Sequence, residues 1–197
     1  AINIFNVLST DDYTGDITVR NSYPNCPYWK ETFNLALLNL TDSDLEGHVH
    51  LEQYNVSDAK NRNRVGLNIA SDITIGGLSD NGGSSTHLSS GTWFESEDAH
   101  CNDLSEEYTS FYTEEENTLT INAHSDFEFN GKVYGSLNLV KKGSGVQSFL
   151  GDMSSFNGSV EVQGGTLEIA ESVFVCRKNV VTFVKLVPVV KHEYLSA

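Results

Sequence analysis

A short segment hinged on glycine recurs along this 197-residue chain and constrains its fold more than any other feature. In each copy an aromatic or apolar residue comes two positions before a glycine, and alternating apolar residues follow the glycine. A glycine bend that leads into a period-2 pattern is typical of a tight turn entering a half-buried strand. The copies span residues 13–19, 45–51 and 156–162, with a weaker copy at 129–133.

A second element, Leu-x-Leu or Leu-x-Ile, also recurs, and its apolar residues again alternate. Copies occupy residues 38–40, 67–69, 119–121, 137–139 and 167–169. One such strand pair cannot bury its own apolar face, whereas stacked copies share a core. The sequence therefore predicts an all-β fold, with a parallel β-helix or solenoid-like stack favoured. The uneven spacing of the glycines leaves two alternatives open, a β-sandwich and a novel two-part β fold with a short acidic insertion.

Changes in composition along the chain suggest three regions. Residues 1–94 form an N-terminal β region in which 33–40 is a strand and the Gly- and Ser-rich stretch 76–91 is an exposed loop. Residues 95–117 are an acidic insertion or linker, and 118–197 form a C-terminal β region. Within it, the basic, Val-rich tail 171–197 is predicted to add a final strand pair that covers an open end of the stack.

The net charge of −15 limits the function classes. An acidic body repels phosphate backbones, so nucleic-acid binding is disfavoured at neutral pH. No run of about 18 apolar residues occurs, so no membrane-spanning helix is expected. Cys26, Cys101 and Cys176 are widely spaced without a CxxC motif, which leaves their pairing open and indicates neither a zinc knuckle nor a thioredoxin-like site. No cofactor is expected.

Residues 136–170 resemble an autotransporter-associated β-strand repeat of the passenger type. The segment has a Leu-x-Leu strand, a Lys-x-Gly-x-Gly turn, a second strand, an aromatic-x-Gly-x-Val-x-Val strand and a closing Gly-Thr-Leu strand. The matching residues are Leu137, Leu139, Lys141, Gly143, Gly145, 146–150, Phe156, Gly158, Val160, Val162, Gly165, Thr166 and Leu167. Residues 76–116 and the tail after Ala170 do not match the repeat.

The resemblance implies a right-handed parallel β-helix and a secreted or cell-surface location. It also implies a non-enzymatic, adhesin-like module of bacterial type that binds extracellular glycoprotein, glycan or matrix. The alternative is an acid-acting aspartic-type peptidase that degrades extracellular glycoproteins such as mucin. The sequence does not decide between a binding module and an enzyme, but it favours the binding module because no catalytic motif is present.

The candidate catalytic residues for that peptidase are Asp12 and Asp16, which flank Thr14-Gly15. Two carboxylates that share a proton can activate water. However, the usual Asp-Thr-Gly order is absent, and a polar turn before a repeat strand explains the same residues.

Two further groups could bind ligands. Trp29, Tyr28 and Trp93 could stack against sugars, although aromatic residues in an all-β chain more often fill the core. Asp98, His100 and Asp103 are weak candidates for a metal site, because a second ligand pair is missing nearby. His48 and His50 project to one face of an alternating strand, where they are expected to be outward-facing strand residues.

Overall fold

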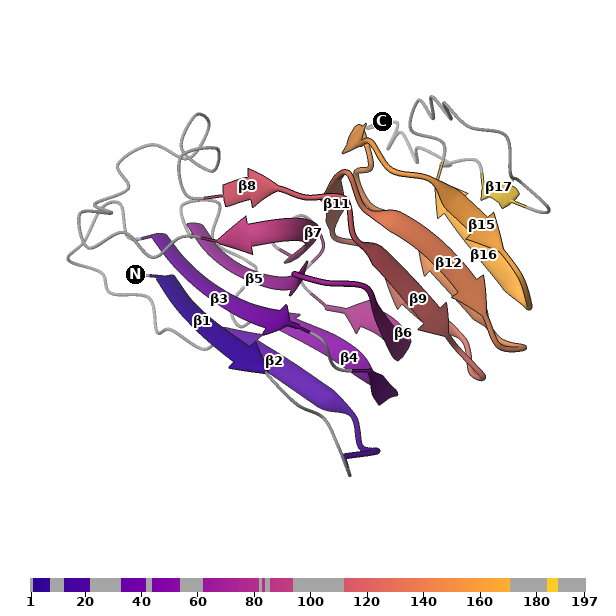
Figure 1. Cartoon of the computed structure of the whole chain (residues 1–197), viewed down its shortest axis with the longest axis horizontal. Coiled ribbons are helices and arrows are strands. Elements are labelled where there is room, and N and C mark those ends of the chain that lie inside the picture. Colours follow the sequence, from indigo (N-terminus) through magenta and orange to yellow (C-terminus); the bar gives the residue numbers. More distant parts are fainter. Residues whose placement is uncertain are drawn as a thin grey trace, which may run out of the picture.

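The computed structural model describes residues 2–7, 13–21, 33–41, 44–53, 62–81, 83, 86–93, 112–170 and 184–187. Within these ranges the protein is an all-β solenoid of parallel strands, which confirms the favoured fold class. Successive coils stack along the long axis from the N-terminal to the C-terminal side (Figure 1). A β-sandwich, by contrast, is built from antiparallel sheets.

Three sheets run along this stack. Sheet A has the order β1-β3-β5-β7-β11-β14, and β8 pairs antiparallel with β7 at its side. Its strands are Ile2–Val7, Phe33–Leu40, Arg62–Ile69, Thr86–Trp93, Lys132–Gly135 and Ser155–Phe156, and β8 is Tyr112–Glu114.

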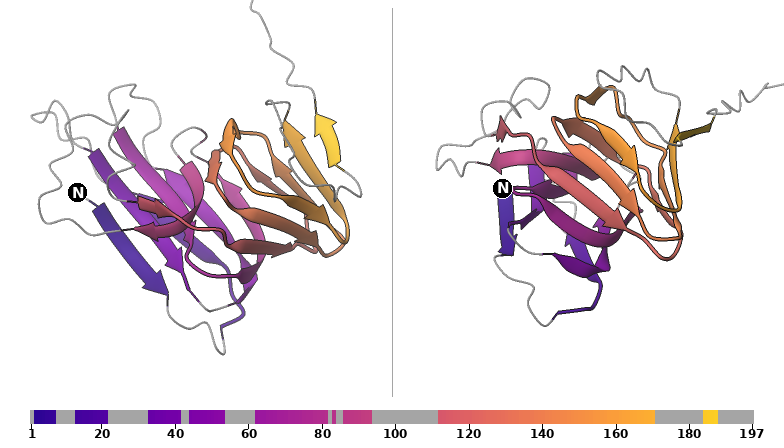
Figure 2. Two further views of the ribbon diagram at one scale, coloured as in Figure 1. Left: turned by 45° about the horizontal axis from the view of Figure 1, so that its top comes forward. Right: turned by 45° about the vertical axis from the view of Figure 1, so that its right-hand side comes forward.

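Sheet B has the order β2-β4-β6-β9-β12-β15. Its strands are Ile17–Asn21, Leu45–Gln53, Ile73–Asp80, Thr118–Asn122, Asn138–Lys142 and Val160–Val162. Sheet C exists only in the C-terminal part and has the order β10-β13-β16-β17 (Figure 2). Its strands are Phe127–Phe129, Val146–Phe149, Thr166–Ala170 and Val184–Val187. Sheets A and B both contain strands from either side of residues 95–117.

The coils differ in length between the two ends of the molecule. In the N-terminal coils (residues 2–93), Asn39 contacts Asn68 of the next coil, 29 residues later, and Asp16 contacts His48, 32 residues later. In the C-terminal coils (residues 118–170), the corresponding separation is 20 residues between Ser148 and Glu168. Long coils carry two strands of up to nine residues, and short coils carry three strands of two to five residues.

The predicted repeat elements are strands, as expected, but copies of one element take different places in the coil. The copies at 13–19 and 156–162 lead into β2 and β15 of sheet B, and the copy at 45–51 lies within β4 of the same sheet. The copy at 129–133 instead leads into β11 of sheet A. The Leu-x-Leu copies are spread over all three sheets. Because every sheet presents one face to the same core, the same alternation suits each of them.

The hinge glycines are required by the close approach of the neighbouring coil. A Cβ atom at Gly47 would overlap the carbonyl oxygen of Gly15, and one at Gly158 would overlap that of Leu137. In the turn of the 136–170 repeat, Gly143 and Gly165 also have positive φ angles of 72° and 65°. Larger residues at these corners would separate adjacent coils.

The core is a continuous column of mainly aliphatic side chains, with two buried phenylalanine rings in sheet C. Leu51, Ile69 and Ile75 have no exposed surface. Phe129 of β10 and Phe149 of β13 pack edge to face, with ring centroids 5.9 Å apart and an interplanar angle of 76°. Aromatic stacking between successive coils thus stabilises sheet C.

Gln147 joins the N-terminal and C-terminal coils through the core. Its fully buried side-chain amide donates to the carbonyl oxygen of Leu78 (2.9 Å) and accepts from the Leu78 amide nitrogen (3.0 Å). The amide therefore mimics a strand neighbour for β6 at the point where sheet C begins. Two buried backbone groups that lie between sheets are satisfied in this way.

Lys141 occupies an inward position of β12 and is 1% exposed. Its Nζ donates to the carbonyl oxygens of Lys142, Gly143 (3.2 Å), Ala123 (3.4 Å) and Gly164 (3.5 Å). Burial lowers the pKa of this ammonium group, while the charge of Asp126 acts in the opposite direction. A ring of carbonyl oxygens is the compensation that a buried cation requires, and it accounts for lysine in the Lys-x-Gly-x-Gly turn.

The structure corrects the prediction of an exposed loop at 76–91. Residues 73–80 form β6 and 86–93 form β7, and Ser89 and Ser90 are fully buried. Ser89 donates to the Asn68 side chain (2.9 Å), which in turn donates to Asn39 (2.7 Å). The Gly- and Ser-rich composition therefore reflects a polar ladder across three strands of sheet A, which small and amide side chains allow.

Other local predictions have different outcomes. Residues 33–40 form β3, as predicted, and the tail contributes β17, which pairs parallel with β16. The second strand predicted for the tail would fall on residues outside the described ranges, and so do the three cysteines. Within the described ranges, no helix is long and apolar enough to cross a membrane.

Candidate functional site

Most of the candidate functional residues predicted from the sequence lie outside the described residues. Trp93 is the last residue of β7, and its backbone pairs with Tyr112 of β8. Asp16 precedes β2 and is described in full. The remaining candidates lie outside the described residues: Asp12, Tyr28, Trp29, Asp98, His100 and Asp103. The peptidase pair, the aromatic platform and the metal cluster therefore stay predictions.

Asp16 connects the first two coils of sheet B. Its Oδ1 accepts a hydrogen bond from the His48 amide nitrogen (2.9 Å) and lies 2.9 Å from Nδ1 of the same histidine. The amide hydrogen bond, followed by the side-chain one, lowers the pKa of this exposed carboxyl group. A general acid needs a raised pKa, so this geometry favours a structural carboxylate.

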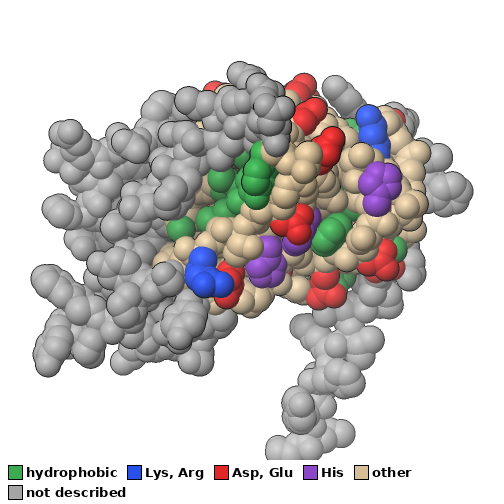
Figure 3. Space-filling view, turned by 90° about the horizontal axis from the view of Figure 1, so that it is seen from below, with side chains coloured by type: hydrophobic (Ala, Val, Ile, Leu, Met, Phe, Trp, Pro, Cys, Tyr) green, Lys and Arg blue, Asp and Glu red, His purple; other side chains and the backbone are tan. Residues whose placement is uncertain are grey.

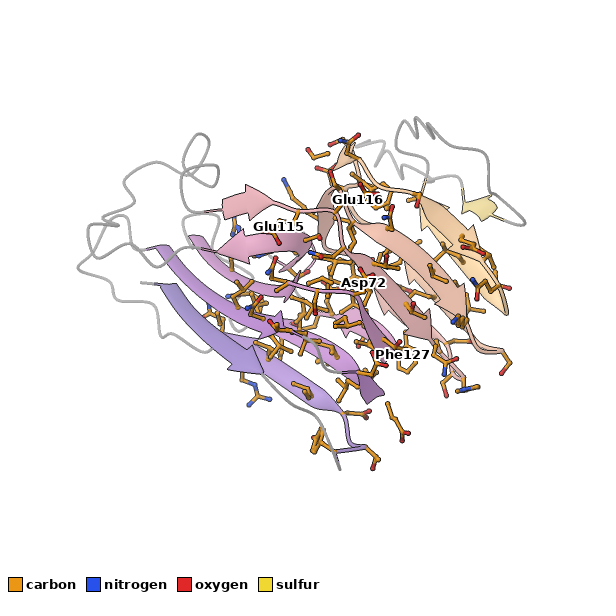
Figure 4. All side chains as sticks on the ribbon, viewed as in Figure 1. Asp72, Glu115, Glu116 and Phe127 are labelled. Atoms are coloured by element: carbon orange, nitrogen blue, oxygen red, sulfur yellow. The ribbon has the colours of Figure 1, made fainter. Side chains whose placement is uncertain are left out.

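His48 is also part of an aromatic contact on the outer face of sheet B. Its ring stacks on Phe127, with centroids 4.8 Å apart and an interplanar angle of 23°. Phe127 lies over Gly77 of β6, where a Cβ atom would overlap its ring (Figure 4). His50, two residues along β4, contacts the Ser79 hydroxyl at 2.8 Å. Both histidines thus face outward, as predicted, and are partly covered by their neighbours.

Beside this contact, the outer face of sheet B is hollowed into a groove of about 440 Å³. Asp44, immediately before β4, and Glu46 of β4 line one side, and Asn122, the last residue of β9, and the following His124 line the other. The floor is β6, which presents Thr74 and Gly76 between the two sides. Figure 3 shows acidic and histidine side chains gathered on this side of the molecule.

The groove exists because the strands change partners here. β9 pairs with β6 only as far as Ile75, after which the chain crosses toward sheet C. β4 is irregular between Leu45 and His48, where its register with β6 shifts. Gly76 adds no side chain to the floor, and a Cβ atom there would overlap the Glu46 carbonyl oxygen. A partner change, a bulge and a glycine thus leave the groove open.

The groove residues suit binding better than chemistry. Asp44 and Glu46 are exposed carboxylates on the same side of the groove, and its lining, as far as the structure describes it, includes no lysine or arginine. Strand neighbours lie about 4.8 Å apart, so walls on either side of β6 leave room for one extended side chain. Within the described residues, no group of three His, Cys, Asp or Glu side chains could hold a metal ion.

Sequence reasoning missed these groove residues. Asp44, Glu46 and His124 have no distinctive spacing, and Gly76 begins the stretch that the composition predicts to be a loop. The alternating pattern of 45–51 did place Glu46 on the outer face, but only the partner change of β6 brings it opposite His124.

Comparisons with known proteins add no information on the fold or the groove. No protein-family model, no curated protein and no solved structure matches the chain.

Proposed function

We propose that this chain is a passenger-type β-solenoid module of a secreted or cell-surface protein, and that it binds extracellular glycoprotein or matrix through the groove on sheet B. The groove carries this proposal, because two carboxylates line one side of a floor that contains a glycine, on an otherwise regular sheet face. Resemblance of 136–170 to the autotransporter-associated repeat supports the passenger-type assignment.

The chemistry of the lining favours a basic segment of a partner polypeptide. A lysine or arginine side chain can lay its methylene stem over Gly76 and bring its charge between Asp44 and Glu46. The overall charge of −15 would also attract a basic partner and repel sulfated or sialylated glycans. We therefore expect protein contacts, rather than anionic sugars, to supply most of the affinity.

The alternative, an aspartic peptidase, has less support. Its mechanism needs two carboxylates within hydrogen-bond reach that share a proton. Asp16 instead accepts from His48, and its pKa is lowered. The binding module is consequently the function that the described residues support best.

A solid-phase assay with a mucin and a basic matrix glycoprotein tests the proposal. The Glu46→Gln variant removes one groove carboxylate with little change in shape, and we expect roughly tenfold weaker binding to the matrix glycoprotein. Glu161→Gln is the matched control, because it makes the same charge change on β15 of the same sheet. Equal binding by both variants would refute the groove as the site, and the absence of binding by the parent chain would refute the matrix preference.

A further inference from the structure

A stacked pair of rings adjoins the groove on the outer face of sheet B. The floor strand β6 passes from Gly76, which lies in the groove, to Gly77, and the Phe127 ring occupies the space that a Cβ atom of Gly77 would fill. His48, the β4 partner of Gly77, stacks on the same ring at 4.8 Å. We call Phe127 and His48 the ring pair; Figure 4 labels Phe127. The groove therefore leads directly to an aromatic surface.

The ring pair is within reach of the groove carboxylate Glu46. Glu46 and His48 are two residues apart on β4, where buried and outward-facing side chains alternate. Residues two apart on a strand present their side chains to the same face about 7 Å apart. Phe127 is only partly buried, so some of its ring is open to solvent. A ligand bound to the Glu46 carboxylate can therefore touch the ring pair as well.

The negative charge of the groove is concentrated on the β4 side. Thr74 N donates to Asp44 Oδ1 (2.6 Å), which fixes this carboxylate to the groove floor. Glu46 is exposed, and within the described residues its carboxylate takes part in no hydrogen bond or ion pair. On the opposite side, Lys142 pairs with Asn122 in the next coil and carries a positive charge. A cationic ligand is therefore drawn toward Asp44 and Glu46.

A carboxylate beside an aromatic ring suits arginine better than lysine. The planar guanidinium group donates in a fork to carboxylate oxygens and also stacks on aromatic faces. The lysine ammonium group is a compact, strongly hydrated point charge that lacks both the fork and the plane. Contact of a cation with a ring is also more often made by arginine. Charge attracts either side chain to the groove, but the ring pair distinguishes between them.

We propose that the groove and the ring pair select an arginine side chain of the partner polypeptide. This inference rests on the proposed binding function and names the ligand of the same site. The aliphatic stem of the arginine lies over Gly76, and its guanidinium group donates to the Glu46 carboxylate and contacts the Phe127 ring. Asp44, fixed by Thr74, adds negative charge without having to move.

Two small probes test the selection of arginine over lysine. N-acetyl-arginine amide and N-acetyl-lysine amide are titrated into the whole, isotope-labelled chain and followed by NMR. We expect both probes to shift the amide signals of Glu46, Gly76 and Gly77, and the arginine probe to bind about fivefold more tightly. Equal dissociation constants would overturn the selection of arginine and leave the groove as a binding site. If neither probe shifts these signals, this inference falls together with the groove's role in the proposed function.

Phe127→Leu separates the ring contact from the charge. Leucine keeps an apolar side chain over Gly77 but has no aromatic face, so the preference for arginine should fall below about twofold while the lysine probe binds as before. Phe156→Leu is the matched control, because Phe156 is likewise partly buried against the core but lies on β14 of sheet A. It should keep the fivefold preference. An unchanged preference in Phe127→Leu would overturn the role of the ring pair.

Glu46→Gln gives a second test at an exposed position, where the fold does not depend on the side chain. The substitution removes the anionic acceptor of the fork, so we expect about tenfold weaker binding of the arginine probe and about threefold weaker binding of the lysine probe. Glu161→Gln, with the same charge change on β15, should leave both dissociation constants unchanged within about twofold. An equal loss for the two probes in Glu46→Gln would show that this carboxylate supplies charge alone, which would overturn the forked contact.

Discussion

The N-terminal and C-terminal coils are both stacked in parallel, but different contacts hold the coils together in the two regions. The N-terminal coils have long strands, aspartate carboxylates that accept hydrogen bonds from backbone amides of the next coil, and a polar ladder from Asn39 through Asn68 to Ser89. The C-terminal coils have short strands, glycine turns with positive φ, and the buried ammonium group of Lys141. A coil of about 20 residues has short strands and closely spaced turns, so its chain forms three sheets and not two. Its turns are stabilised by a side chain inside the coil, Lys141.

The junction between them shows why the difference matters. β6 pairs with β4 along its second half and with β9 along its first half, and Gln147 completes it where sheet C begins. The groove lies at this change of partners. In a solenoid with one coil length throughout, β6 would keep the same strand partners along its whole length, and we would expect no groove at this position.

Substitution of the hinge glycines should give the largest effect, and a similar one in both regions. Gly47→Ala and Gly158→Ala each drive a methyl group into the backbone of the preceding coil. We expect each to lower the free energy of unfolding by about 3 kcal/mol, measured from urea denaturation. Gly164→Ala is the control, because its nearest neighbour would be 3.3 Å away. A much smaller effect at Gly47 than at Gly158 would mean that the long coils are looser than the geometry indicates.

Loss of the buried ammonium group should affect the C-terminal coils next most strongly. Lys141→Met keeps the aliphatic stem but leaves the carbonyl groups of Ala123, Gly143 and Gly164 without their shared donor. We expect a loss of roughly 2–3 kcal/mol in urea denaturation. Lys142→Met, at the adjacent exposed position, should change stability by less than about 0.5 kcal/mol. Equal effects would indicate that the carbonyl ring is not a specific stabilising contact.

Removal of the link between the two regions should cost less but should change cooperativity. Gln147→Leu removes both hydrogen bonds to Leu78, and we expect a loss of about 2 kcal/mol. Thermal unfolding, followed by calorimetry, should broaden toward two transitions as the halves uncouple. Gln163→Leu changes an exposed glutamine of the same type and should leave a single transition. A single sharp transition for Gln147→Leu would show that other contacts couple the halves.

The smallest effect is expected at a surface ion pair of the N-terminal coils. Arg20 and Glu52 are 2.6 Å apart, but their side chains are 58% and 24% exposed. A double-mutant cycle of Arg20→Ala and Glu52→Ala should give a coupling energy below about 0.5 kcal/mol that decreases with salt. A coupling above about 1 kcal/mol would show that this surface charge pair contributes substantially to the stacking of the N-terminal coils.

The strand content and the stacked architecture were readable from the sequence. Glycine hinges with period-2 alternation predicted strands at 45–51 and 156–162, and 33–40 was also predicted to be a strand. Residues 45–51 and 33–40 lie in β4 and β3, whereas 156–162 contains the end of β14, a turn and the whole of β15. The same local signals could not assign a strand to a sheet, because sheets A, B and C all present one alternating face to a common core. They also misled at 76–91, since glycine and serine serve equally as loop residues and as small residues in crowded strands.

The candidate site depended on tertiary structure almost entirely. Asp16 and His48 were noticed in the sequence, but their contact joins residues 32 positions apart, and the groove brings Glu46 together with His124. Which residues meet across coils depends on coil length, and coil length depends on turns whose residues carry no period of their own. Alternation along one strand is a local property that sequence alone determines, whereas the partner one coil away is set by the packing of the whole stack.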